Sequence, residues 1–443
     1  MTMNPVAIRR VSFDCLSCLS LNRRGFGDGF SGGRILNSPR RTRPTRRTCS
    51  VVASLITSSD SFEVGRLIGS YGFMNVTSYS GLQLGPDIEY ASGDIGRLKF
   101  QDVGEGSVKI RLYEGRISQG PFRGIPVIFK VYPGKRAGGI EADMMAANEL
   151  NTHAFLQSSR KATPTNNLII LVGGFETQTG EQWLAFRDDG KYSAADYAKV
   201  ASEKTSRGRT QGIWNPYDQD QAIKRRRNFV IKILQGAMRG LAFMHDHDRL
   251  HQSLGPSSIV LKISMLFFQF SAGKMIHFVG STTAEREAIY LIPRLRDLAF
   301  SVDIRPSCFE EGVSQGGLSE SLWRRASSSG AFSILEKRAF GIADDIYEAG
   351  LLFAYLAFIP FCEVGVMDSL SLQRLLENTF RLDLDAVREY CLADERLEEA
   401  VRFLDIGDGA GWDLLQAMLN ADYSKRPMAE AVLRHRFMTC SVP

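Results

Sequence analysis

The stretch HQSLGPSSIVL, residues 251–261, decides the fold of this 443-residue chain. Gly255 and Pro256 form a turn signal together with the serines around them. The apolar run 259–261 then begins a segment that we expect to be a buried strand. Packing of that strand would hold the loop rigidly, and rigid loops often carry chemistry. The loop nevertheless contains no carboxylate, so its chemical role has to be inferred from the sequence around it.

Upstream of the loop the apolar residues change their spacing. A helical period covers the stretch just before it, with six apolar residues on one face: Val230, Ile233, Leu234, Ala237, Leu241 and Met244. The first half instead shows short β-branched and aromatic runs at 107–113, 127–132, 167–173 and 183–186, interrupted by one helix at about 141–156. Further helices are expected at 416–419 and 429–433. This order predicts an α+β fold in which a small, mainly antiparallel sheet with one packed helix precedes a larger helical lobe.

Two charged residues stand out in the strand-rich half. Lys130 lies within a predicted strand, and Glu149 follows 19 residues later in the predicted helix. The pair resembles the strand lysine and the helix glutamate of the protein kinase family, whose ion pair positions the phosphates of ATP. The segment VGEGSVK, residues 103–109, resembles the glycine-rich phosphate loop of that family, with Gly104 and Gly106 in place.

The resemblance continues downstream in the family's order. Four segments align with the catalytic loop H-R-D-L-x-x-x-N, the metal-binding D-F-G, the D-x-W-x-x-G helix opening and the closing D-x-x-x-R-P: HQSLGPSS at 251–258, LRDLA at 295–299, DIYEAG at 345–350 and DYSKRP at 422–427. The resemblance implies a two-lobed protein kinase-like fold over residues 96–440. The N-lobe is expected at about 96–188 and the C-lobe at about 189–440.

The aligned catalytic loop departs from the family pattern at four of its eight positions. Ser253 stands where the family has the aspartate that accepts the proton of the substrate hydroxyl, and a serine hydroxyl cannot serve as that base near neutral pH. Ser258 replaces the asparagine that helps to hold the second magnesium, Gly255 replaces a lysine, and Gln252 replaces an arginine. Loss of the base alone removes roughly 10² to 10⁴ in rate, or about 3 to 5 kcal/mol of barrier lowering.

The remaining site residues imply binding without efficient turnover. By the resemblance, Lys130, Glu149 and Asp297 still bind ATP and magnesium, with Asp297 as a metal ligand and Ser258 as a weak one. Asp248 lies too early in the sequence to replace the missing base. The leading hypothesis is a pseudokinase that acts on a protein partner by interaction or scaffolding. Two alternatives stay open: a slow, atypical ATP-dependent Ser/Thr protein kinase with a protein substrate, and a purely structural protein whose cleft binds no nucleotide.

The first 50 residues have a composition of their own. They contain ten arginines, no lysine and only two acidic residues, together with ten serines and threonines. This composition is typical of a transit peptide and favours import into a chloroplast, with the mitochondrion as the alternative. An arginine-rich nucleic-acid-binding tail is the rival interpretation. Without residues 1–50 the chain has 44 basic against 47 acidic residues, so its composition gives no support for binding to nucleic acid.

Residues 51–95 and 262–280 fit no motif of the family. The first segment, rich in Gly, Ser and Tyr, is interpreted as a lead-in, with Gly65, Gly69 and Gly72 as ordinary turn glycines. The second is an apolar insert between the catalytic loop and Asp297. It is interpreted as an added hairpin, an interaction surface or intronic sequence read into the gene.

Two further segments carry structural expectations. Residues 301–336 contain three consecutive serines and no clear A-P-E motif, which predicts a flexible, atypical activation segment. The longest uncharged apolar run, 350–362, is shorter than the roughly 18 residues that a membrane span needs. We therefore expect a core helix there and no transmembrane segment.

Overall fold

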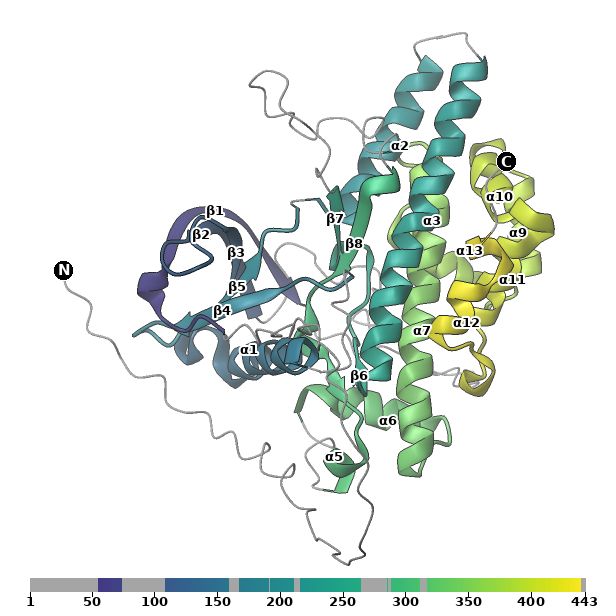
Figure 1. Cartoon of the computed structure of the whole chain (residues 1–443). Helices are drawn as coiled ribbons and strands as arrows, with labels where there is room; N and C mark the ends of the chain where they lie inside the picture. Colours follow the sequence, from purple (N-terminus) through teal and green to yellow (C-terminus); the bar gives the residue numbers. More distant parts are fainter. Residues whose placement is uncertain are drawn as a thin grey trace, which may run out of the picture. The chain divides into compact units, whose positions relative to one another are not determined.

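The computed structural model describes residues 55–73, 108–158, 167–190, 192–210, 216–263, 285, 288–310 and 317–439. Three expectations therefore fall outside the described residues: the transit peptide at 1–50, Gly104 and Gly106 of the glycine-rich segment, and most of the insert at 262–280. Contacts between residues divide the chain after Leu55. The description below concerns the unit that begins at Ile56, whose elements are labelled in Figure 1.

Five strands form the N-terminal sheet, in the order β1-β2-β3-β5-β4, and each neighbouring pair is antiparallel. Their bounds are Phe62–Phe73 for β1, Val108–Ile117 for β2, Pro126–Tyr132 for β3, Leu171–Glu176 for β4 and Gln182–Arg187 for β5. In β3 the alternation of side chains places Val127, Phe129 and Val131 in an apolar cluster on one face. Lys130 is thereby turned to the opposite face, in the middle strand of the sheet.

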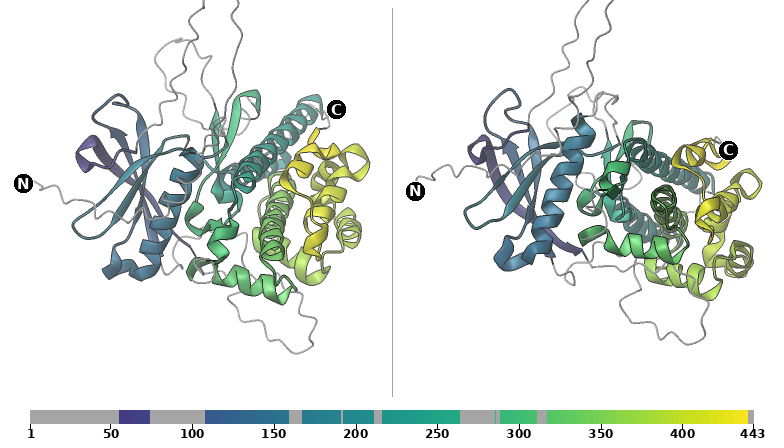
Figure 2. Two further views of the ribbon diagram at one scale, coloured as in Figure 1. Left: turned by 60° about the horizontal axis from the view of Figure 1, so that its bottom comes forward. Right: turned by 90° about the horizontal axis from the view of Figure 1, so that it is seen from below.

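Helix α1 (Lys135–Ser158), which is kinked at Gly139, runs along the sheet face that carries Lys130 (Figure 2). Its buried residues recur at three- and four-residue intervals: Ala142, Met145, Ala146, Glu149, Thr152, His153 and Leu156. The helix also contacts the second lobe, because Asn148 Nδ2 donates to the carbonyl oxygens of Ala299 at 2.8 Å and of Ser301 at 2.7 Å. The helix expected at about 141–156 is therefore present, and it links the sheet to the chain that follows Asp297.

The first strand corrects the expected domain boundary. β1 lies inside the segment 51–95 that was interpreted as a lead-in, and it pairs with β2 from Phe62 to Phe73. Ile56 adds a short bridge at the other edge, since its N–H donates to Val172 O at 3.0 Å. The kinase-like domain therefore begins by Ile56 and not at residue 96.

Irregular pairing explains why this strand is not predicted from the sequence. The register of β1 against β2 shifts between Val64 and Leu67 and again between Leu67 and Gly69. Each shift interrupts the two-residue alternation by which a strand is recognised. Gly65, Gly69 and Gly72 all lie within β1, so their interpretation as turn glycines was wrong.

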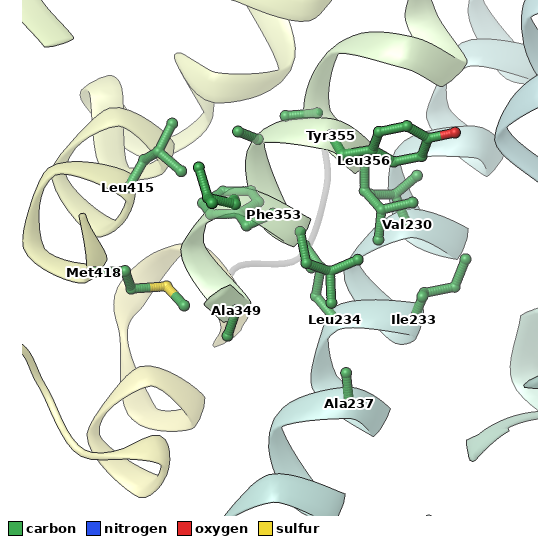
Figure 3. Packing of buried hydrophobic residues seen from close by; sticks show 14 of the residues in the cluster. Val230, Ile233, Leu234, Ala237, Ala349, Phe353, Tyr355, Leu356, Leu415 and Met418 are labelled. Atoms are coloured by element: carbon green, nitrogen blue, oxygen red, sulfur yellow. The ribbon is translucent and has the colours of Figure 1, made fainter. Parts of the chain in front are cut away.

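The second lobe is mostly helical. Its helices are α2 (Ala194–Thr210), α3 (Pro216–Asp246), α5 (Pro306–Glu310), α6 (Glu320–Ser328), α7 (Ile334–Phe358), α8 (Ser369–Gln373), α9 (Leu384–Leu392), α10 (Glu398–Leu404), α11 (Ile406–Met418), α12 (Ala429–Arg434) and α13 (Arg436–Thr439). α7 is the central one, because Phe353 on it packs between Leu234 of α3 and Leu415 of α11 (Figure 3). The expected core helix is thus confirmed over 350–358. Among the described residues, no helix has the length and apolar character needed to cross a membrane.

Two short antiparallel pairs surround the HQSLGPSS loop. β6 (Arg249–Leu250) pairs with β9 (Val302–Asp303), and β7 (Ile259–Ile263) pairs with β8 (Leu291–Leu295). The strand expected at 259–261 is therefore confirmed. Because Leu295 lies opposite Ile259, the chain returns beside the loop after the insert, and Asp297 follows directly.

The segment 301–336 is more ordered than its composition predicted. Helix α6 buries Leu322, Trp323 and Ala326. Arg325 on the same helix donates from Nη1 and Nη2 to the buried Asp344 of α7 at 2.7 and 3.0 Å. Apolar burial and this paired interaction hold α6 against α7, so the expectation of a flexible stretch is wrong for this part of the segment.

A glycine in β2 tests whether β1 belongs to the domain. A Cβ on Gly115 would lie 2.4 Å from the Phe129 ring and 2.6 Å from the Glu63 carbonyl oxygen of β1. We expect Gly115→Ala to push β1 away and to lower the free energy of unfolding by about 1–3 kcal/mol, measured by urea denaturation. A Cβ on Gly69 in β1 would have no neighbouring atom within 4 Å, so Gly69→Ala should change the free energy of unfolding by less than about 0.5 kcal/mol. Equal stability of the two variants would contradict the pairing of β1 described above.

Candidate functional site

A buried ammonium group lies at the centre of the site. Lys130 Nζ is 2.6 Å from Glu149 Oε2 and 2.9 Å from Asp297 Oδ1, and all three side chains are at most 4% exposed. The structure thus brings together three of the residues that the sequence predicted. Burial alone would lower the pKa of Lys130, but Asp297 and Glu149 outweigh it and raise that pKa well above its ordinary value. The lysine is therefore charged at neutral pH.

Two tyrosines complete the contacts of this buried cluster. The Tyr132 hydroxyl donates to Glu149 Oε2, and the Tyr71 hydroxyl donates to Asp297 Oδ1 at 2.9 Å. Burial, and then the neighbouring carboxylates, raise the pKa of both tyrosines, so both hydroxyls keep their protons. Lys130 Nζ also lies 5.7 Å from the centre of the Tyr71 ring, close enough for a cation–π attraction.

Tyr71 is the site residue that the sequence reasoning missed. It lies on β1, two positions after Gly69 and directly before Gly72, inside the segment that was interpreted as a lead-in. An aromatic residue within a cluster of glycines, one strand away from Lys130, was the available signal. The long sequence separation between this cluster and Lys130 hides the relation, because residues 74–107 lie between β1 and β2 in the sequence.

Asp297 is held from both sides. Its Oδ1 accepts from Lys130 and Tyr71, and its Oδ2 lies 3.3 Å from Arg296 Nε. Burial would raise the pKa of Asp297, but Lys130 and then Arg296 reverse the effect and lower it to about 2. Its backbone lies in the left-handed region, with φ of 68°, which is uncommon for a residue with a side chain. The carboxylate is therefore ionised and fully engaged by protein groups.

Ser253 is turned toward the backbone of Asp297. Its hydroxyl donates to the Asp297 carbonyl oxygen at 2.7 Å, and the residue is only 1% exposed. The second nearby polar atom is His251 Nδ1, 3.4 Å from Ser253 Oγ. Because the hydroxyl proton is committed to a carbonyl oxygen, this position offers no negative charge and no free proton acceptor.

The rest of the loop is held by Asp345, at the start of the aligned D-x-W-x-x-G segment. One carboxylate oxygen accepts from the backbone N–H of His251 at 2.8 Å, and the other from the backbone N–H and the Nε2 of Gln252, each at 2.9 Å. His245 Nε2 also lies 2.9 Å from Asp345 Oδ2. These bonds fix the loop in place, which agrees with its predicted rigidity and does not depend on a base at position 253.

The predicted metal ligands are not assembled in this arrangement. The Ser258 hydroxyl donates to the carbonyl oxygen of Gly255 at 2.8 Å and accepts from its N–H at 3.0 Å, so it serves the loop itself. Both oxygens of Asp297 are engaged as described above. Within the described part of the chain, no cluster of three or more His, Cys, Asp or Glu side chains is placed to hold a metal ion. Magnesium at these residues would therefore require Ser258 and Asp297 to exchange some of their present partners, and their role as metal ligands stays a prediction.

The Asp248 carboxylate already has a partner. It forms an ion pair with Arg338 of α7, and the residue has a positive φ of 55°. That Asp248 does not replace the missing base stays a prediction.

The depressed pKa of Asp297 predicts an acid-dependent contribution to stability. Because its folded pKa of about 2 lies below the ordinary value of 3.8, the contribution is complete above about pH 4 and is lost as the pH falls toward 2. Asp297→Asn should be less stable than the wild type at pH 7, and this deficit should shrink by about 1 kcal/mol between pH 5 and pH 3. Urea titrations at each pH measure it, with the exposed Asp385→Asn as control. A deficit that stays constant over this range would contradict the pKa shift.

Comparisons with known proteins were made on the sequence and on the structure. No family model matches the sequence, and no curated protein matches it. Among solved structures, a Stt7 homologue from Micromonas algae, soaked with ATP, shares 16% identity and a TM-score of 0.48 over 92% of this chain and 98% of its own. The twitchin kinase region from C. elegans shares 13% identity and a TM-score of 0.44 over 88% of this chain and 48% of its own. By its own strand order, its Lys130–Glu149 pair and the placement of its loop, the chain has a two-lobed protein kinase-like α+β fold.

Proposed function

We propose that this protein is a pseudokinase, which keeps the kinase-like fold without efficient phosphoryl transfer and acts by binding another protein. The observation that carries the proposal is the hydrogen bond from the Ser253 hydroxyl to the Asp297 carbonyl oxygen. A kinase acceptor hydroxyl must lose its proton, and the loop residue that takes it is an ionised aspartate. In this protein the same position holds Ser253, whose hydroxyl donates a hydrogen bond.

The neighbouring carboxylates have other roles. Asp345 accepts hydrogen bonds from the loop backbone, Asp248 pairs with Arg338, and Asp297 pairs with Lys130. Moving any of them to an acceptor hydroxyl would break a buried or partly buried interaction. The expected loss of roughly 10² to 10⁴ in rate from the missing base therefore stands without local compensation.

Contacts that stabilise the helical lobe are compatible with a role in protein binding. The Asp345 contacts to the loop and the packing of α6 against α7 preserve a rigid helical lobe that needs no catalysis to be stable. Such a lobe can present a constant surface to a protein partner.

A slow, atypical Ser/Thr kinase is the second candidate, and the intact Lys130–Glu149 pair favours it. That pair positions ATP phosphates in kinases, and phosphoryl transfer depends mainly on positioning and charge neutralisation. Both candidate functions therefore include the proposal that Lys130, Glu149 and Asp297 bind ATP. Magnesium binding requires in addition that Asp297 exchange one of its present partners.

Radiolabelled phosphotransfer to a serine- and threonine-rich acceptor protein separates the two candidates. We expect the wild type and Lys130→Met to give the same background signal, while an active kinase assayed alongside gives a strong one. The exposed Lys425→Met is the matched control for the substitution itself. Because Lys130→Met leaves two buried carboxylates without their cation, circular dichroism must show that it is folded, and Asp297→Asn serves as a second inactive variant. Phosphotransfer by the wild type that both variants abolish would establish the slow kinase instead.

The arginine-rich, acid-poor start of the chain supports import into a chloroplast as the proposed location. Residues 1–60 fused to a fluorescent reporter should direct it into chloroplasts, while the reporter alone stays outside. A mutant fusion with the ten arginines of residues 1–50 changed to alanine should lose import. Accumulation in mitochondria or in the nucleus would contradict the chloroplast proposal.

A further inference from the structure

Tyr71 reaches from β1 into the centre of the charged site. Its position in β1 lies opposite Ile110 of β2, and β2 separates it from the strand that carries Lys130. The side chain is 7% exposed, and its hydroxyl donates to Asp297 Oδ1 at 2.9 Å. Its ring centre lies 5.7 Å from Lys130 Nζ. One side chain from the edge of the sheet thus contacts both the cation and the anion of the site.

These contacts use the groups that a metal-bound phosphate would need. Magnesium requires carboxylate oxygens with open lone pairs in near-octahedral geometry, and Asp297 Oδ1 already accepts from both Tyr71 and Lys130. A phosphate oxygen requires an ammonium that faces it, and Lys130 is enclosed by Glu149, Asp297 and the two tyrosine rings. The charges that a magnesium nucleotide would pair with are therefore paired within the protein.

We propose that Tyr71 occupies the metal and phosphate position of this site, and that its displacement controls access of a magnesium-bound nucleoside triphosphate. The inference rests on the proposed function, since it concerns the same Lys130–Asp297 site. A ligand that binds only the form with Tyr71 withdrawn has its apparent affinity reduced by the fraction of molecules in that form. Removing the hydrogen bond from the Tyr71 hydroxyl to the Asp297 carboxylate raises the fraction of molecules in which Tyr71 is withdrawn.

The size of the effect follows from the bond that is lost. A hydrogen bond to a charged group in a buried site corresponds to about a ten- to a hundredfold change in an equilibrium. Tyr71→Phe removes the bond and keeps the ring, so we expect the affinity for a magnesium nucleotide to rise about tenfold. Tyr71→Ala removes the ring as well and should raise it further.

Isothermal titration calorimetry of the full chain with magnesium and a non-hydrolysable ATP analogue tests the proposal. We expect weak or undetectable binding by the wild type, tighter binding by Tyr71→Phe and the tightest by Tyr71→Ala. Tyr113→Phe is the matched control, because this tyrosine lies on β2 and packs against Trp183, with 5.0 Å between the ring centres, away from the charged cluster. It should bind as the wild type does. Asp297→Asn added to Tyr71→Ala should abolish the gain if the nucleotide enters with its metal at Asp297.

Two results would overturn the proposal. The wild type binding the analogue as tightly as Tyr71→Phe would show that the tyrosine does not obstruct the site, and absence of binding in every Tyr71 variant would show that something else does. If Tyr71→Ala fails to fold, the conservative Tyr71→Phe still decides between these results. Phosphotransfer that depends on Lys130 would defeat the pseudokinase proposal alone, while equal affinities would defeat the Tyr71 inference alone.

Discussion

The structure depends on one buried ammonium group, that of Lys130. A buried charge costs several kcal/mol unless it is paired and hydrogen-bonded, so the elements around it must supply partners. α1 supplies Glu149 and the turn after β8 supplies Asp297, while β1 supplies Tyr71, whose hydroxyl donates to Asp297 and whose ring faces the ammonium. The N-terminal sheet, its one helix and the helical lobe are therefore joined through a single cluster of charges. A ligand that separates Lys130 from its carboxylates must offer it a negative charge instead. A ligand that separates Asp297 from Lys130 must offer the carboxylate a positive charge.

The same constraint explains how the loop keeps its form without a base. Asp345 binds the loop backbone, and Ser253 closes the contact to Asp297 through a neutral hydrogen bond. A serine there places no further carboxylate beside Asp297, which already shares one lysine with Glu149. The serine at this position is thus compatible with the electrostatics around Asp297.

Much of this arrangement follows from the sequence, because it is encoded by residue type at fixed positions. Lys130, Glu149 and Asp297 were predicted together, the strand at 259–261 and the helix at about 141–156 formed as the sequence indicated, and the apolar run 350–362 is helical in α7 as far as Phe358. β1 was missed because its two register shifts break the alternation of side chains. The partners of Tyr71 and Ser258 were not predictable, since a hydroxyl can bond in several directions and only the folded backbone selects one.

A crystal structure of the chain grown with magnesium and a non-hydrolysable ATP analogue tests the central claim most directly. The claim is that Lys130 and Asp297 pair with groups of the protein itself and that position 253 provides no base. We predict the Tyr71 hydroxyl on Asp297 Oδ1, the Ser253 hydroxyl on the Asp297 carbonyl oxygen, and no carboxylate oxygen facing the terminal phosphate position. A metal ion bound to Asp297 together with an aspartate or glutamate oxygen directed at that position would contradict it.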